Sequence, residues 1–233
     1  MNSIIATIIT FAIALGFLRL MDFLAQRGWI EPRLSRKLIH IGTGPIFVLC
    51  WLLFPDRPES RWLAALVPLM IVVQFALVGL GVMKDEAAVQ AMSRTGNPRE
   101  ILRGPLYYGI AFVVLTVIFW KSSPVGMTAL MLMCGGDGLA DIVGRRVSSP
   151  KLAWSGEKSV AGTLSVFVGG WLLSAFVLFI FILAGVFSRS FGSYLLPLTV
   201  VALVGTLVES LPQKDIDNIT VTLATVIAGL IVF

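Results

Sequence analysis

The chemistry of this sequence centres on two carboxylates that lie in an apolar segment. Asp137 and Asp141 occur near the end of a hydrophobic run that begins at Pro124. Charge at membrane depth is energetically costly and usually functional. If the segment is helical, the two side chains are four residues apart and share one face. Because paired carboxylates suit Mg²⁺ that carries a nucleotide phosphate, we predict Asp137 and Asp141 as metal ligands.

Glycines and arginines surround these carboxylates. Glycine allows a backbone to approach a ligand closely, so we expect Gly136 and Gly138 to lie against a nucleotide. Arg145 and Arg146 follow in the same stretch and are predicted to bind its phosphates. The alternative interpretation is structural: the arginines would neutralise the carboxylates at a membrane boundary.

A second polar cluster contains Lys37 and His40, which are three residues apart and share a helix face. Lys37 is predicted to bind phosphate, and His40 to bind phosphate or act as a base. Gly42 and Pro45 follow, and we expect them to loosen the helix just inside the membrane. Alternatively, Lys37 and His40 are interfacial anchors at headgroup depth.

A third cluster, Lys158 and Ser159, directly precedes another apolar run. The free N–H groups and the dipole at a helix start favour anions, so this pair predicts a phosphate site. An anchoring role at the membrane surface is the alternative for Lys158. The sequence contains no Walker A pattern and no glycine-rich loop of the protein-kinase type.

The last polar cluster is acidic. Asp215, Asp217 and Asn218 offer oxygen ligands, and Glu209 lies at the end of an apolar run. A second metal position or a base that activates an alcohol is one interpretation. The other is that Asp217 or Asn218 caps the final helix.

The composition identifies a membrane protein. The 233 residues are 57% apolar and only 13% charged, with a mean hydropathy of +0.92, whereas a soluble domain carries roughly 25% charged residues. The net charge of +5 does not indicate nucleic-acid binding, because the cations lie in short loops between apolar runs. Two cysteines without metal-ligand spacing are expected to be buried thiols.

The expected fold is an all-α, polytopic bundle of about eight transmembrane helices, with residues 1–233 forming a single transmembrane domain. Each apolar run approaches the ~20 residues that span a bilayer. The runs are Ile4–Leu24, Ile39–Phe54, Trp62–Val82, Pro105–Trp120, Pro124–Val143, Ser159–Val186, Tyr194–Leu211 and Ile219–Phe233.

The loops between these runs alternate in charge. Thirteen Lys and Arg residues fall in the odd loops and four in the even loops. The positive-inside rule therefore puts the odd loops in the cytoplasm and both termini outside. All four polar clusters then lie on the cytoplasmic side of a plasma or internal membrane, where nucleotides are available.

These clusters, in this order, resemble the membrane polyprenol kinases, which comprise phytol, farnesol and dolichol kinases. The resemblance covers the chain from about Leu34 to its end. The runs that carry it are RKLIHIGTG (36–44), GDGLADIVGRR (136–146), KSVAGT (158–163), ESLP (209–212) and DNIT (217–220).

The resemblance implies transfer of the γ-phosphoryl group of CTP to an isoprenoid alcohol such as phytol, with Mg²⁺. Asp137, Asp141 and Lys158 would be catalytic, and His40 or Glu209 would accept the proton of the alcohol. A more distant similarity to CDP-diacylglycerol synthases gives the alternative of a CTP:phosphatidate cytidylyltransferase. A transporter is the non-enzyme alternative, although the sequence shows no internal repeat.

Overall fold

The structure, a computed structural model, describes residues 1–213 and 216–233, which form helices joined by loops. Lys214, and Asp215 of the last polar cluster, lie outside these ranges. The described residues contain no strand, only an isolated bridge between Lys151 and Ser159. The α-helices are α1 (Ser3–Gln26), α2 (Pro32–Cys50), α3 (Ser60–Gly79), α4 (Glu86–Met92), α5 (Gly104–Ile118), α6 (Pro124–Arg146), α7 (Val160–Leu183), α8 (Phe191–Glu209) and α9 (Asp217–Val232), with short 3₁₀ helices η1 (Trp51–Leu53) and η2 (Pro98–Leu102).

Eight of these helices correspond to the eight predicted apolar runs. Within the described residues, seven helical spans are long and apolar enough to cross a membrane, and α9 is an apolar helix of 16 residues. The all-α, polytopic membrane fold is therefore confirmed. The short helix α4 is an addition, in the loop between α3 and α5.

Helix α2 differs from the prediction in both its start and its continuity. It begins at Pro32, seven residues before the predicted Ile39, because proline at the first position suits a helix start. It also continues through Gly42 and Pro45, so the expected loosening of the helix is wrong. Lys37 and His40 consequently lie on a regular helix one turn apart.

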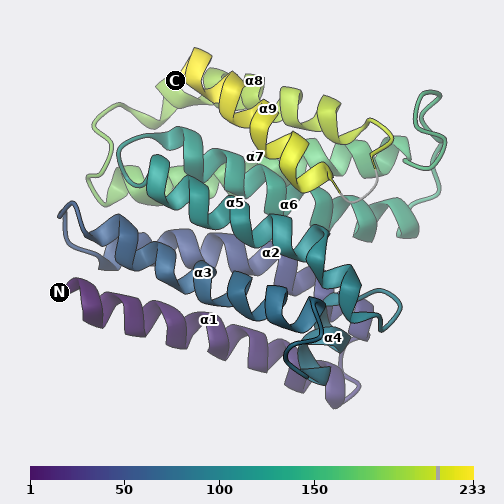
Figure 1. Ribbon diagram of the computed structural model, residues 1–233. Coiled ribbons are helices and arrows are strands. Elements are labelled where there is room, and N and C mark those ends of the chain that lie inside the picture. Colours follow the sequence, from purple (N-terminus) through teal and green to yellow (C-terminus); the bar gives the residue numbers. More distant parts are fainter. Residues whose placement is uncertain (214–215) are drawn as a thin grey trace.

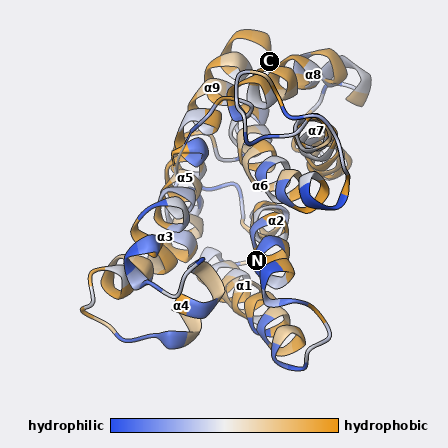
Figure 2. Ribbon diagram, turned by 90° about the vertical axis from the view of Figure 1, so that its right-hand side faces the viewer, coloured by the Kyte–Doolittle hydropathy of each residue, from blue (hydrophilic) through white to orange (hydrophobic). Residues whose placement is uncertain are grey.

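The helices run side by side, and the loops gather at the two ends of the bundle. Figure 1 shows both chain termini at one end, and α4 with the loop that follows α6 at the opposite end. The odd loops therefore share one end, as successive helices that alternate in direction require, whereas the side of the membrane that this end faces stays a prediction. Viewed from that end, hydrophilic residues lie on the near ends of α2, α4 and α6, and orange apolar residues dominate the helices (Figure 2).

Helix α6 is the central helix of the bundle. In its apolar stretch 72% of the residues are buried, against 22% to 44% in the other long helices. Small residues allow this: a Cβ atom at Gly135 would lie 3.2 Å from the carbonyl oxygen of Gly169 on α7. Helices in membranes associate through such close backbone contacts, so glycine places α7 directly against α6.

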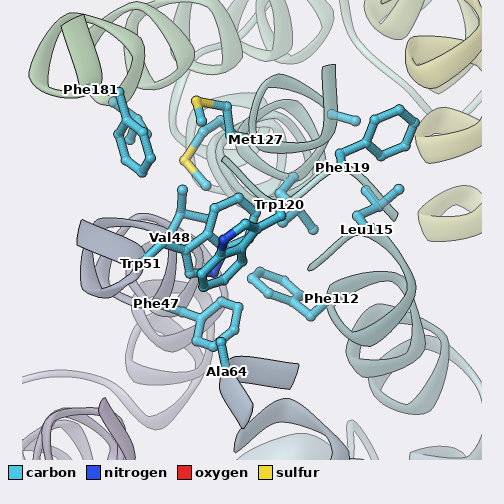
Figure 3. Close-up of a cluster of buried hydrophobic side chains, with 14 of the residues drawn as sticks. Phe47, Val48, Trp51, Ala64, Phe112, Leu115, Phe119, Trp120, Met127 and Phe181 are labelled. Carbon is cyan, nitrogen blue, oxygen red and sulfur yellow. The ribbon is translucent and has the colours of Figure 1, made fainter. Parts of the chain in front are cut away.

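An aromatic cluster fills the membrane-embedded core beside α6 (Figure 3). Trp51 is fully buried, and its ring centroid lies 5.1 Å from Trp120, 6.1 Å from Phe47 and 6.4 Å from Phe181. Phe112 packs edge-to-face on Phe47 at 5.7 Å. The cluster joins α2, α5 and α7 towards the end of the bundle that holds the chain termini, because Trp51 directly follows α2 and Trp120 lies just after α5.

Trp51→Ala is expected to lower the free energy of unfolding by about 3–5 kcal/mol, because it leaves a cavity among the rings of Phe47, Trp120 and Phe181. The measurement is a denaturant titration of the protein in mixed detergent micelles. Trp62→Ala is the matched control: Trp62 is 60% exposed to the surroundings of the bundle, so its loss should change stability by less than about 0.5 kcal/mol. Equal effects of the two substitutions would contradict the assigned core.

Candidate functional site

The site is built around the carboxylate of Asp137 on α6. Lys37 Nζ donates a hydrogen bond to Asp137 Oδ2 at 3.2 Å, and His40 Nε2 lies 3.4 Å from the same oxygen. The Lys37 side chain is only 15% exposed and that of Asp137 30%. The structure therefore brings the first two predicted clusters together, with both α2 side chains on one carboxylate.

Two further acids converge on Asp137. Glu209, the last residue of α8, and Asp217, the first residue of α9, each place a carboxylate oxygen within 4.8 Å of the other two acids. Asp217 Oδ1 accepts a hydrogen bond from the Asn218 N–H, but neither residue is the helix cap, which is Ile216. The capping interpretation is therefore wrong, and Asp217 belongs to a three-acid group.

Lys158 reaches this group from the start of α7. Its Nζ donates to Glu209 Oε1 at 2.7 Å and also to the backbone carbonyl of Glu209. Ser159 caps α7, because its Oγ accepts a hydrogen bond from the N–H of Gly162 at 3.2 Å. The expected lysine–serine helix start is confirmed, although the Ser159 hydroxyl is occupied by the cap.

Asp141 lies one turn beyond Asp137 on α6, but its carboxylate has different partners. Arg33 Nη2 lies 3.2 Å and Arg145 Nε 2.7 Å from Asp141 Oδ1. Asp141 is not a member of the three-acid group. The two predicted metal ligands share a helix face as expected, yet only Asp137 lies among other potential ligands.

The glycines beside Asp137 face neighbouring helices. A Cβ atom at Gly136 would lie 2.9 Å from Cγ1 of Val166, and one at Gly138 would overlap the side chain of Ile41. Their predicted contact with a nucleotide remains a prediction, whereas their visible contribution is to bring α2 and α7 close to Asp137. Arg146 is exposed in the last turn of α6.

Two cavities meet at Asp137. A polar cavity of about 340 Å³ opens between α6 and α7. A second, largely apolar cavity of about 170 Å³ extends between α1, α2, α3 and α5. Asp137 lines both. The polar cavity is also lined by Asp141, Arg145, Lys151, Lys158, Ser159 and Glu209, and the apolar one by Lys37, His40, Tyr108, Phe47, Phe112 and Asn218.

Sequence reasoning missed Tyr108 and Arg33. Tyr108 suits an interfacial aromatic belt by composition, but its hydroxyl donates to the carbonyl of His40 at 2.7 Å. Its ring lies 4.4 Å from the His40 ring, so it packs within the site. No spacing rule connects α5 with α2. Arg33 similarly reaches Asp141 across 108 residues of sequence.

Lys158→Met is expected to cost about 3–5 kcal/mol of stability, because it leaves the carboxylate of Glu209, only 7% exposed, without its cation. Lys158→Met combined with Glu209→Gln should recover part of this loss. Denaturant titration of the single variants and the double variant measures both values. A double variant whose loss equals the sum of the two single losses would contradict the coupling.

Comparisons with known proteins place the chain in a family. It is 44% identical to a probable phytol kinase 1 of Oryza sativa, over 98% of this chain and 73% of that protein. It is 39% identical to phytol kinase 1 of Arabidopsis thaliana over 96% and 73%, and 38% identical to a farnesol kinase of the same plant over 100% and 77%. These relatives are named as chloroplastic. No family model and no solved structure matches. At this identity and coverage, the chain belongs to the polyprenol kinase family, which includes the phytol and farnesol kinases.

Proposed function

We propose that this protein transfers the γ-phosphoryl group of CTP to an isoprenoid alcohol, phytol or a similar prenol, and releases the prenyl monophosphate. The single observation that carries the proposal is the position of Asp137, which lines both a polar and an apolar cavity. A prenol kinase needs this arrangement, because its donor is highly charged and its acceptor is a lipid. The names of the relatives support the acceptor class.

The polar cavity suits the phosphates of the donor. Lys158, Arg145 and Lys151 line it and supply positive charge around the carboxylates. Phosphoryl transfer depends mainly on positioning and on electrostatic stabilisation of the phosphoryl oxygens, so cations held in place by hydrogen bonds suffice. Asp141 contributes by holding Arg145 and Arg33. We expect this end of the bundle to face the compartment that holds the nucleotide, the cytoplasm by the charge rule.

The apolar cavity suits the alcohol. Its tail would lie among α1, α2, α3 and α5, and its hydroxyl would reach His40 and Asp137. Among the described residues, His40 Nε2 is buried and makes no hydrogen bond, although it lies 3.4 Å from Asp137 Oδ2, whereas Glu209 is already bonded to Lys158. This difference favours His40 as the base. The alcohol oxygen forms a bond to the γ-phosphorus, the bond from that phosphorus to the β-phosphate oxygen breaks, CDP leaves, and His40 takes the proton.

The residues also fit a divalent cation. Asp137, Glu209 and Asp217 bring three carboxylates within 4.8 Å of one another, and oxygen atoms are the ligands that Mg²⁺ prefers. Lys37 and Lys158 balance two of these acids, so a cation would offset the remaining repulsion. When bound, Mg²⁺ would neutralise charge on the phosphates. We therefore propose Asp137, Glu209 and Asp217 as the metal ligands. Asp141, which the sequence paired with Asp137, is no longer assigned to the metal.

The donor and the reaction can be tested with labelled CTP and the purified protein in detergent with Mg²⁺. Label from γ-³²P-CTP is expected on phytol, farnesol or geranylgeraniol, and Asp137→Asn should reduce it by at least about 10²-fold, as loss of a charge that positions the phosphates implies. Label from α-³²P-CTP on phosphatidic acid would instead identify a cytidylyltransferase. γ-³²P-ATP in place of CTP tests the choice of nucleotide.

The metal assignment predicts a pattern that does not depend on turnover. Addition of Mg²⁺ or Mn²⁺ should raise the thermal unfolding temperature of the unaltered protein, because a ligand stabilises the state that binds it. The increase should disappear in Asp137→Asn and weaken in Asp217→Asn. Asp141→Asn is the matched control and should retain it. If Asp141→Asn abolishes the increase and Asp217→Asn retains it, the metal ligands are Asp137 and Asp141, as the sequence predicts.

A further inference from the structure

The apolar cavity extends along α2 and α5 away from the polar site. Along α2 it is lined from His40 to Phe47, a distance of roughly 10 Å at 1.5 Å per residue. Along α5 its lining runs from Gly104 to Phe112, a distance of about 12 Å at the same rise per residue. Ala14 of α1 completes the wall at this depth. The cavity therefore begins at the polar site and extends into the apolar core.

Phe47 and Phe112 are the lining residues of α2 and α5 that lie farthest along each helix from the polar site, and Val67 is the corresponding residue of α3. The rings of Phe47 and Phe112 pack edge-to-face with their centroids 5.7 Å apart, and each side chain is 3% exposed. Trp51 stands directly behind Phe47 at 6.1 Å and is itself fully buried. Figure 3 shows Phe47 and Phe112 facing each other beside Trp51. The end is thus formed by large rings that neighbouring rings hold in place.

We infer that Phe47 and Phe112 form a floor that sets the length of the isoprenoid chain accepted by this protein. This inference rests on the proposed function. It assigns to two core residues a specificity role at the far end of the cavity from the reacting hydroxyl. The relatives are named for alcohols of different length, since farnesol has three isoprene units and phytol four.

The discrimination is steric. A tail that leaves the bilayer for an apolar cavity exchanges one apolar environment for another, so burial itself distinguishes lengths only weakly. A tail that is too long must displace packed rings, and close-packed interiors resist such displacement. The rings consequently reject long chains more strongly than the cavity attracts short ones.

The experiment measures kcat/KM for geraniol, farnesol and geranylgeraniol with the full chain in lipid nanodiscs. These alcohols share one chemistry and differ only in the number of isoprene units. Phe112→Ala and Phe47→Ala should raise the ratio of geranylgeraniol to farnesol by about tenfold, the scale on which pockets discriminate small apolar increments. Ala14→Leu places extra bulk in the cavity and should lower the ratio by a similar factor.

Phe181→Ala is the matched control. Phe181 is fully buried and packs 6.4 Å from Trp51, but it does not line the cavity. Its removal loosens the same core and should leave the length ratio unchanged. Phe112→Leu provides a milder floor variant if an alanine variant fails to fold.

Two results would overturn the floor. One is an unchanged ratio in active Phe112→Leu and Ala14→Leu proteins. The other is an equal shift in Phe181→Ala, which would assign the effect to general loosening of the core. Both leave the proposed kinase intact, because the unaltered protein still phosphorylates a prenol. An unaltered protein that phosphorylates none of the three alcohols or phytol would overturn the proposed function, and the floor with it.

Discussion

The arrangement of this bundle depends on the cost of keeping the Asp137 carboxylate inside an apolar assembly. Removing an ion from water costs several kcal/mol even after relaxation. Lys37 offsets that cost through a hydrogen bond at 3.2 Å. Helices α2 and α6 must also approach closely for Lys37 to reach Asp137. Gly138 on α6 allows this approach, because it has no side chain where Ile41 of α2 packs. The ion pair and the small-residue contact therefore fix the position of α2 on α6 together.

Asp137 lies at the boundary between a polar and an apolar environment. On one side of Asp137, α7 contributes the lysine and the backbone N–H groups of a helix start. On the other side, α2, α3 and α5 contribute mainly apolar and aromatic side chains. Neither set can reach into the other environment without exposing apolar surface or burying unpaired charge. A charged donor and a lipid acceptor can thus approach a common carboxylate from different directions.

The sequence predicted the parts of the fold that depend on local pattern. Hydropathy predicted eight apolar helices, and their number and order agree with the structure. Lys37 and His40 were placed correctly on one face, since a spacing of three residues determines a face on any helix. The wider polar cluster also assembled as its position near the helix ends implied, with Asp137, Lys158 and Glu209 lining one cavity.

The sequence did not predict which groups several residues contact. Glycine permits close approach of either a ligand or another helix, so composition alone could not show that Gly136 and Gly138 face Val166 and Ile41. Proline was expected to loosen α2 at Pro45, but the helix continues because neighbouring helices hold it. Tyrosine is typical of the membrane interface by residue type, and only the packing of α5 near α2 directs the Tyr108 hydroxyl to the carbonyl of His40.

Asp137 and Asp141 show how one turn of helix changes the chemistry of a carboxylate. They share a face of α6 and differ in depth by about 6 Å, four residues at 1.5 Å each. At the inner position the neighbours are two other acids together with Lys37 and His40, and at the outer position they are two arginines. A divalent cation is favoured where acids converge, and phosphate oxygens where arginines are held in place. A nucleoside triphosphate with its metal has this same order of charge, with the cation at the reacting end. The depth difference along α6 therefore supports a donor that enters with its terminal phosphate directed towards Asp137.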